Sequence, residues 1–190
     1  MANALENSVE GSMAKNRSLV ERIAQYIPFY RGYKQKNLRR DEDRAVRDTV
    51  ARVLAGSKTD LANAARATVG DLNAMRDMER VRSKVDRYYV DVKKAVNGYS
   101  AFHDSVKILE SELDAVVTWD AQLIDDANAL KQETEQLRNA ADAGSDIKAP
   151  LRNIEATVDQ LIDAYREREN VMRGFVEREN GNGQDSTAGE

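Results

Sequence analysis

Only a few side chains in this 190-residue chain are of a type that could carry acid–base or metal chemistry. His103, the only histidine, stands beside Asp104, and no activated nucleophile lies near it in the sequence. Di-iron and di-manganese helical bundles need Glu-x-x-His pairs on facing helices, which a chain with one histidine cannot supply. We therefore interpret His103 as a solvated or helix-capping residue.

A second candidate is the group of carboxylates beside Trp119, namely Asp120, Asp125 and Asp126. Asp125 and Asp126 are adjacent, so on a helix they point about 100° apart and cannot converge on one ion. The spacing of an EF-hand loop is also missing. These residues are interpreted as a solvated acidic face.

Nucleotide and acyl-transfer chemistry lack their motifs. The ten glycines form neither GxxxxGK nor GxGxxG, and no serine stands in a GxSxG context. The absence of cysteine removes disulfides, thiolate nucleophiles and zinc–thiolate sites. The sequence therefore predicts a protein that is not an enzyme, carries no metal or cofactor and takes no small-molecule substrate.

One segment departs from ordinary helical-bundle sequence. Residues 27–40, IPFYRGYKQKNLRR, combine Pro28 with three aromatic residues and five cations, and they contain no acid. The candidate partner-binding residues in it are Phe29, Tyr30, Arg31, Tyr33, Lys34, Lys36, Arg39 and Arg40. Just upstream, an amphipathic helix is predicted, whose apolar face is the membrane-facing candidate and consists of Leu19, Val20, Ile23 and Ile27.

Three interpretations of this segment remain open. As structure, Pro28 and Gly32 form a corner whose aromatic rings close one end of the core. As a membrane-surface element, the apolar face inserts while the cations meet anionic headgroups. As an RNA or ribosome contact, the cations meet phosphates and the tyrosines stack on unpaired bases. The charge becomes mixed directly after Arg40, which favours a protein or membrane partner over a long polyanion.

Positive and negative charges are concentrated in different parts of the chain, although the net charge is only −4. From Lys15 to Arg40 there are eight cations and one acid, which gives +7. From Asp104 to Lys148 there are four cations and eleven acids, which gives −7. This complementarity would allow the basic segment of one copy to meet the acidic helix of another.

The elements that must position these residues follow from the apolar periodicity. Steps of three and four predict one helix over about 59–97, with Gly70 inside it, after a helix over 34–55 that ends at Gly56. Asn97 and Gly98 then form a tight link. The predicted buried face of the 59–97 helix comprises Leu61, Ala65, Thr68, Leu72, Met75, Met78, Val81, Val85, Tyr88, Val92, Val96 and Tyr99.

Two further long helices follow. The second begins near His103 or Asp104, and the third begins after a turn at residues 143–146, where Asp146 is the predicted N-cap. Their buried faces comprise Val106, Leu109, Leu113, Val116, Leu123, Ala127, Leu130 and Leu137, and then Ile147, Leu151, Ile154, Val158, Leu161, Tyr165, Met172 and Phe175. We expect an all-α fold: an elongated antiparallel three- or four-helix bundle with coiled-coil character and an N-terminal amphipathic helix.

The chain is expected to divide into an N-terminal arm, amphipathic helix and corner (1–33), a helical bundle (34–179) and a polar disordered tail (180–190). No apolar run reaches the length of a transmembrane helix, and the N-terminus lacks a signal-peptide core. A cytoplasmic protein, either free or peripheral to a membrane, is the expectation.

The run IPFYRGYK, an I-P-x-Y-x-G-Y-K motif, is followed downstream by VKKAVNGYSAFHDSVKILESELD. Together they resemble a group of uncharacterised prokaryotic helical-bundle proteins over most of residues 27–130. The resemblance implies a helical fold and brings no activity, cofactor or catalytic residue. The order of an amphipathic N-terminal element and long helical hairpins is also similar to that of membrane-remodelling coiled-coil proteins of the phage-shock type.

These observations lead to one hypothesis and one alternative. The hypothesis is a non-enzymatic helical scaffold that acts through protein–protein contacts, with self-assembly and peripheral attachment to an anionic inner-membrane surface both open. The alternative is an RNA- or ribosome-associated factor that uses the basic aromatic segment 29–40.

Overall fold

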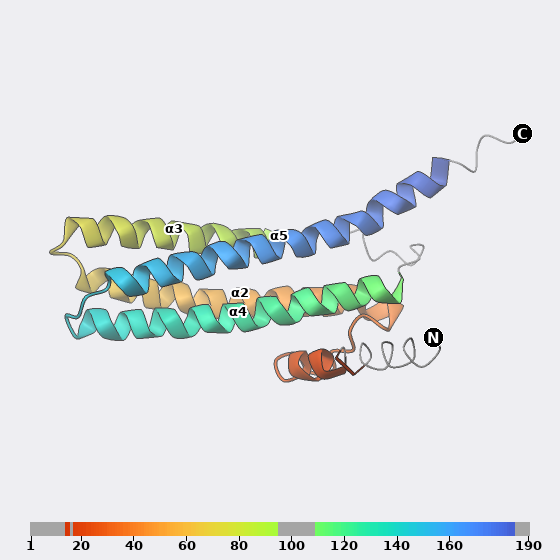
Figure 1. The fold of residues 1–190 in the computed structure, drawn as a ribbon, viewed down its shortest axis with the longest axis horizontal. Coiled ribbons are helices and arrows are strands. Elements are labelled where there is room, and N and C mark those ends of the chain that lie inside the picture. The colour runs from red at the N-terminus through yellow and green to blue at the C-terminus, as the bar shows by residue number, and fades with distance from the viewer. Residues whose placement is uncertain (1–13, 16, 95–108, 185–190) are drawn as a thin grey trace, which may run out of the picture. The chain divides into compact units, whose positions relative to one another are not determined.

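The computed structural model describes residues 14–15, 17–94 and 109–184, with side chains to residue 174. A helix over residues 17–24 and a short 3-10 helix, η1 (Lys36–Leu38), precede four long helices (Figure 1). These are α2 (Arg39–Ala67), α3 (Leu72–Lys94), α4 (Glu110–Asp142) and α5 (Lys148–Gln184). No strand occurs within the described ranges, so the all-α prediction is confirmed. The same ranges contain five α-helices, where three or four were expected for the bundle.

The described chain forms two compact units. The first contains the described residues up to Val46, residues 109–122 and the residues from Arg166 onward. The second contains residues 47–94 and 123–165. The boundaries at residues 46/47, 122/123 and 165/166 fall inside continuous helices, since α2, α4 and α5 each contribute residues to both units.

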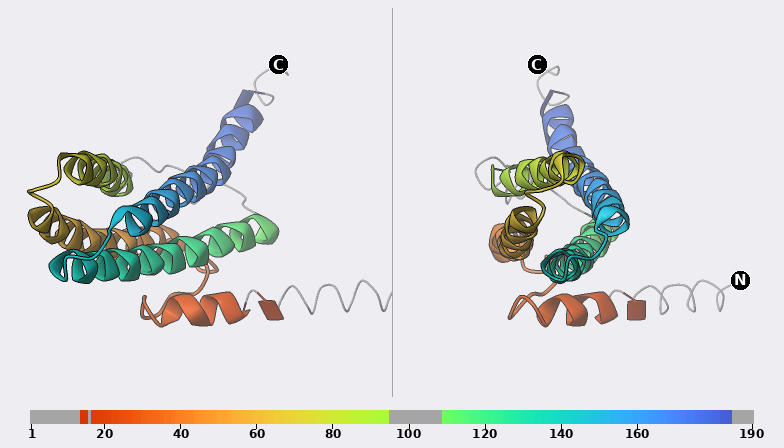
Figure 2. Two further views of the ribbon diagram at one scale, coloured as in Figure 1. Left: turned by 60° about the vertical axis from the view of Figure 1, so that its left-hand side comes forward. Right: turned by 90° about the vertical axis from the view of Figure 1, so that its left-hand side faces the viewer.

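The second unit is built from α3 and the neighbouring parts of α2, α4 and α5. In the right-hand view of Figure 2 these helices follow one another around the unit in the order α2, α3, α5, α4. Cross-helix contacts agree with this order: Arg80 of α3 pairs with Glu155 of α5 at 3.0 Å, and Asp60 of α2 pairs with Arg138 of α4 at 2.9 Å. The core of the unit contains Val50, Leu54, Leu61, Met78, Val81, Val85, Tyr88, Leu123, Ile124, Leu130, Leu137, Leu151, Ile154, Val158 and Leu161.

The predicted helix end at Gly56 is wrong. Helix α2 continues through Gly56 to Ala67, and a Cβ at this glycine would lie 2.9 Å from Cε of Lys131. The missing side chain therefore leaves room for the Lys131 side chain beside α2, and no helix ends at this glycine.

The predicted continuous helix over 59–97 is also wrong, because the chain turns at residues 68–71. Asp71 caps the helix that follows: its Oδ1 accepts hydrogen bonds from the backbone N–H groups of Asn73 (2.9 Å) and Ala74 (3.1 Å). Gly70, predicted to lie within a helix, sits in the turn that separates α2 from α3.

Three apolar residues that were predicted to be buried are exposed. Leu72 is 79% exposed, and Met75 and Leu109 are exposed as well. Leu72 and Met75 belong to the first turn of α3, whose buried face begins only at Ala74 and Met78. Leu109 immediately precedes α4. The predicted burial is therefore wrong at these helix ends.

The turn before the last helix is confirmed. Gly144 has a left-handed backbone with φ of 67°, and Oδ1 of Asp146 accepts a hydrogen bond from the N–H of Lys148 at 3.1 Å. Helix α5 extends to Gln184, beyond the boundary expected at residue 180. The predictions for the Asn97–Gly98 link, His103, Val96, Tyr99 and Val106 lie outside the described residues, as do residues 1–13 and 185–190 and the side chain of Phe175.

Candidate functional site

The first unit buries a cluster of charged and phenolic side chains. Arg168 of α5 and Asp120 of α4 have 0% of their surface exposed. The Nε of Arg168 donates to Asp120 Oδ1 at 2.6 Å, and its Nη2 donates to Oδ1 of Asp43, on α2, also at 2.6 Å. We call Tyr30, Tyr33, Asp43, Asp120 and Arg168 the buried cluster.

The two tyrosines bring the N-terminal segment into this cluster. The hydroxyls of Tyr30 and Tyr33 donate to Asp120 Oδ2 at 3.0 and 2.5 Å, and Nη2 of Arg168 donates to the Tyr33 hydroxyl at 3.2 Å. Their rings meet edge to face with centroids 5.7 Å apart. Burial, followed by the charge of Asp120, raises the pKa of both tyrosines well above the usual range, so they remain neutral donors.

The ionised groups of the cluster depend on one another. Burial raises the pKa of Asp120, although Arg168 and the hydrogen bond from Tyr33 oppose this shift. Burial alone would lower the pKa of Arg168, but Asp120 and Asp43 raise it well above its usual range, so the guanidinium stays charged. Arg168 also pairs with Glu169 at 3.5 Å, so one buried cation contacts three buried carboxyls. The chemistry of this arrangement is to hold four segments together through charge-assisted hydrogen bonds.

A second set of contacts fixes the backbone of the same segment to the start of α2. Glu42 accepts hydrogen bonds from the N–H groups of Arg31 (2.8 Å) and Tyr33 (2.5 Å), one on each carboxyl oxygen. The Nε of Arg39 donates to the carbonyl oxygen of Tyr33 at 2.9 Å. Burial raises the pKa of Glu42, while the two backbone hydrogen bonds lower it in part.

The segment held in this way has an unusual backbone. Phe29 and Tyr33 have φ values of 67° and 63°, and Gly32 between them has 68°. A left-handed conformation is uncommon for bulky residues and costs about 1–3 kcal/mol. At Gly32 a Cβ would lie 3.0 Å from Val20 and 3.3 Å from Val117, so the chain passes closely between the N-terminal helix and α4.

The structure divides the predicted partner-binding residues into two groups. Tyr30, Tyr33 and Arg39 are buried, so their side chains are part of the interior. The others are exposed: Phe29, at 87% of its surface, together with Arg31, Lys34, Lys36 and Arg40. We call residues 28–36 the basic loop.

The apolar face of the N-terminal helix is turned toward the protein. Ile23 and Ile27 are buried, and Leu19 and Val20 are half-buried. As long as the first unit is folded, Ile23 and Ile27 are unavailable to a membrane.

Asp120 was predicted to lie on a solvated face, and this is wrong. Asp125 and Asp126 are half-buried. Arg168, Asp43 and Glu42 were not singled out at all from the sequence. Within the described residues, no three histidine, aspartate or glutamate side chains are grouped so that they could hold a metal ion.

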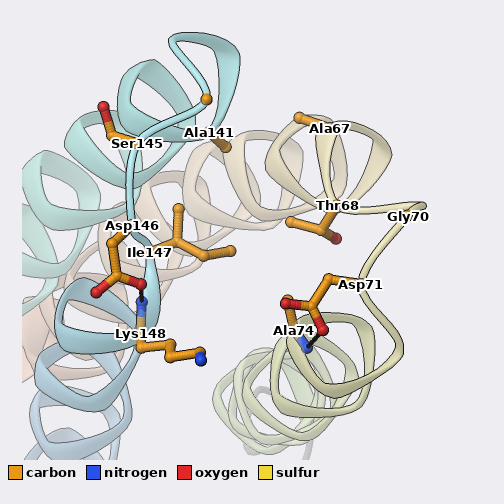
Figure 3. Close-up of a pocket in the computed structure, with 11 residues that line it drawn as sticks. Ala67, Thr68, Gly70, Asp71, Ala74, Ala141, Ser145, Asp146, Ile147 and Lys148 are labelled. Atoms are coloured by element: carbon orange, nitrogen blue, oxygen red, sulfur yellow. Dashed lines mark hydrogen bonds between the residues drawn. The ribbon is translucent and has the colours of Figure 1, made fainter.

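A pocket in the second unit was the other candidate. It has a volume of about 410 Å³ and lies where α3 and α5 begin (Figure 3). Helix N-termini attract anions, but here Asp71 and Asp146 point their carboxyls at the free N–H groups of these two helices. The helix starts are therefore already capped by negative charge.

Comparison with protein-family models, with curated proteins and with solved structures gave no match. None of the described helices combines the length and the apolar composition needed to cross a lipid bilayer.

Proposed function

We propose that this protein is a non-enzymatic helical scaffold that is held at a negatively charged surface by its basic loop. Its helical second unit is then available for protein–protein contacts. The observation that carries the proposal is Phe29: an aromatic side chain that is 87% exposed, on a backbone with φ of 67°. Neither the exposed ring nor the left-handed backbone stabilises the isolated protein, whereas both are explained if the ring is buried in a complex.

The loop is held in place rather than free to adjust. Tyr30 and Tyr33 anchor it inside the first unit, and Glu42 binds two of its backbone N–H groups. Rigid presentation of a contact residue lowers the entropy that must be lost on binding. The buried cluster therefore supports the proposal because it fixes the position of the basic loop.

The charges of the loop define the chemistry of the surface that it contacts. Lys34 and Lys36 are exposed, and neither forms an ion pair with any residue in the described part of the chain. Arg31 is also exposed. A cluster of unpaired cations attracts a negatively charged surface and accelerates association with it.

The alternative, an RNA- or ribosome-bound factor, has less support from the side chains. Base stacking needs accessible aromatic faces, and Tyr30 and Tyr33 are buried with their hydroxyls on Asp120. Phe29 alone remains for stacking in this loop. Self-association, in which the acidic part of a second copy meets the loop, would appear in the experiment below as a crosslink between two copies of the chain.

Photocrosslinking in cells tests the proposed function. A photoreactive phenylalanine analogue replaces Phe29 in the full chain, and a matched variant carries it at Gln160, an exposed position on α5 in the second unit. We expect covalent products at position 29 that disappear when Lys34 and Lys36 are changed to Glu, whereas any products formed at position 160 persist in that variant. Products at position 29 that survive the change of both lysines would overturn the proposal.

A further inference from the structure

We infer that the surface contacted by the basic loop is an anionic lipid surface, in which Phe29 and Tyr26 act as shallow aromatic anchors. This inference rests on the proposed function and names the partner of the same loop. The relevant feature is the turn that ends the N-terminal helix. It exposes Tyr26 (42%) and Phe29 (87%) and buries Ile27 and Tyr30, so two aromatic rings reach the surface while the side chains of Ile27 and Tyr30 point inward.

The turn is braced by backbone hydrogen bonds. The N–H groups of Tyr26 and Ile27 both donate to the carbonyl oxygen of Ile23 at 2.9 Å, and the N–H of Tyr30 donates to that of Ile27 at 3.2 Å. The two exposed rings are therefore presented from a fixed backbone. Phenylalanine and tyrosine are suited to the headgroup region, where an apolar ring is buried while a tyrosine hydroxyl stays hydrated.

The cations that accompany the rings fit the same surface. Arg31, Lys34 and Lys36 are all exposed within seven residues of Phe29. Each cation close to an anionic membrane strengthens binding about fivefold. Two acids, Glu21 and Asp41, are also exposed on the adjoining helices, and Glu21 is paired with Arg17 at 3.3 Å. The loop itself contains no acid.

A lipid surface fits this loop better than a protein surface does. A stable protein interface buries about 1,200–2,000 Å² with complementary shape. Because Tyr30, Gly32 and Tyr33 are buried, the exposed residues of the basic loop are interrupted by buried ones, so the loop offers a small contact surface. A lipid headgroup layer adapts to such a shape, since it needs only an inserted ring and nearby cations.

The N-terminal helix itself does not insert into the membrane in this arrangement. The apolar face of that helix was the membrane-facing candidate, and its residues Ile23 and Ile27 are buried within the first unit. Here the helix stays docked, and the turn after it makes the contact. Binding therefore requires no unfolding of the first unit.

Vesicle sedimentation with the full chain tests the inference. Vesicles contain phosphatidylcholine alone, or equal amounts of phosphatidylcholine and phosphatidylglycerol, and binding is measured at low and at physiological salt. We expect binding to the anionic vesicles only, weakened by salt. Phe29→Asn, which tolerates the left-handed backbone, should lower the partition coefficient tenfold or more, and the pair Lys34→Gln and Lys36→Gln should lower it about thirtyfold.

A matched pair of substitutions controls for net charge. Lys93 and Lys94 are exposed at the end of α3, so Lys93→Gln with Lys94→Gln removes the same charge far along the chain. This variant should bind within about twofold of the wild type. If it loses as much binding as the loop variant, attraction is non-specific and the inference is overturned.

Insertion of the ring itself is read from fluorescence. In a Trp119→Phe background, Phe29→Trp gives a single tryptophan in the loop, since Trp119 is the only natural one. Its emission should shift to the blue when anionic vesicles are added. No shift, or no binding to either vesicle, would overturn the lipid partner. If photocrosslinks at position 29 persist and join protein or RNA instead, the docking function stands and only the lipid inference fails.

Discussion

Replacing Arg168 with methionine is the sharpest test of the buried cluster. Methionine keeps much of the apolar stem of arginine and removes the charge that Asp43 and Asp120 share. Both carboxyls are almost completely buried, so neither can be solvated by a small movement. Breaking a buried ion pair on one side costs about 3–5 kcal/mol, which is a large part of the total stability of an ordinary domain, about 5–15 kcal/mol.

The assay is urea unfolding followed by tryptophan fluorescence. Trp119 precedes Asp120 directly on α4, so its emission reports on the first unit. We expect Arg168→Met to lower the free energy of unfolding by about 3–5 kcal/mol. Arg173 lies on the same helix and in the same unit and is exposed, so Arg173→Met should change the free energy by less than about 0.5 kcal/mol.

A double substitution separates the loss of charge pairing from the loss of packing. Asp120→Asn removes the negative charge that loses its ion pair in Arg168→Met. The double variant should therefore be more stable than the sum of the two single effects predicts, by about 0.5–3 kcal/mol. The reasoning is refuted if Arg168→Met costs less than about 1 kcal/mol, or if the two substitutions are additive.

Two further predictions concern pH and backbone conformation. The raised pKa of Glu42 means that the folded protein holds this proton more tightly than the unfolded chain, so its contribution to the free energy of unfolding falls as the pH rises from about 4.3 through the folded pKa. Glu42→Gln also replaces one acceptor of a backbone N–H, which should lower the free energy of unfolding by about 1–3 kcal/mol. In urea titrations we expect this loss of stability to be larger at pH 5 than at pH 7. A larger loss at pH 7 would show that the pKa of Glu42 is lowered in the folded protein. In the second unit, Gly70→Ala meets no atom within 4 Å and should raise the free energy of unfolding by about 0.4–1 kcal/mol, whereas Gly144→Ala, with φ of 67°, should lower it by about 1–2 kcal/mol. Circular dichroism melts measure both glycine variants, and a shift of the same sign in the two would contradict the assignment of their backbone conformations.

The sequence carried enough information for the helices and too little for their ends. Apolar spacing predicts the interior of α3 and α5 well, because burial of one face dominates there. Glycine was misleading in both directions: Gly56 lies inside α2 and Gly70 lies in a turn. The local sequence does not distinguish a glycine that ends a helix from a glycine that leaves room for a side chain of another helix. For Gly56 the deciding residue is Lys131, which is 75 positions further along the chain.

The buried cluster left a signal in the sequence that periodicity alone could have found. In α4 the buried apolar face includes Val116 and Leu123, which are seven residues apart. Asp120 lies four residues after the first and three before the second, at a position where the pattern requires a buried residue. In α5, Arg168 fills the corresponding gap between Tyr165 and Met172. A charged residue in the register of a buried face must be paired or hydrogen-bonded. Opposite charges in such gaps on two helices indicate that these helices meet there.

The sequence does not indicate that Asp43 and the two tyrosines also belong to the buried cluster. Asp43 belongs to a helix start that reads as mixed in charge, and nothing in its neighbours marks it as buried. The hydroxyls of Tyr30 and Tyr33 reach Asp120 only because the basic loop has left-handed residues at Phe29, Gly32 and Tyr33. Of these three residues, only the glycine is of a type that indicates a left-handed backbone from the sequence.

The hydrogen bond between Arg168 and Tyr33 joins residues that are 135 positions apart. At a synthesis rate of about 5–20 residues per second, roughly 7–27 s pass between the appearance of the two residues. Asp43 therefore waits for Arg168 while 125 residues are added, and Asp120 waits while 48 are added. The first unit is therefore completed late, so the nascent chain should need protection, by a chaperone or by delayed collapse, until its last long helix has been made.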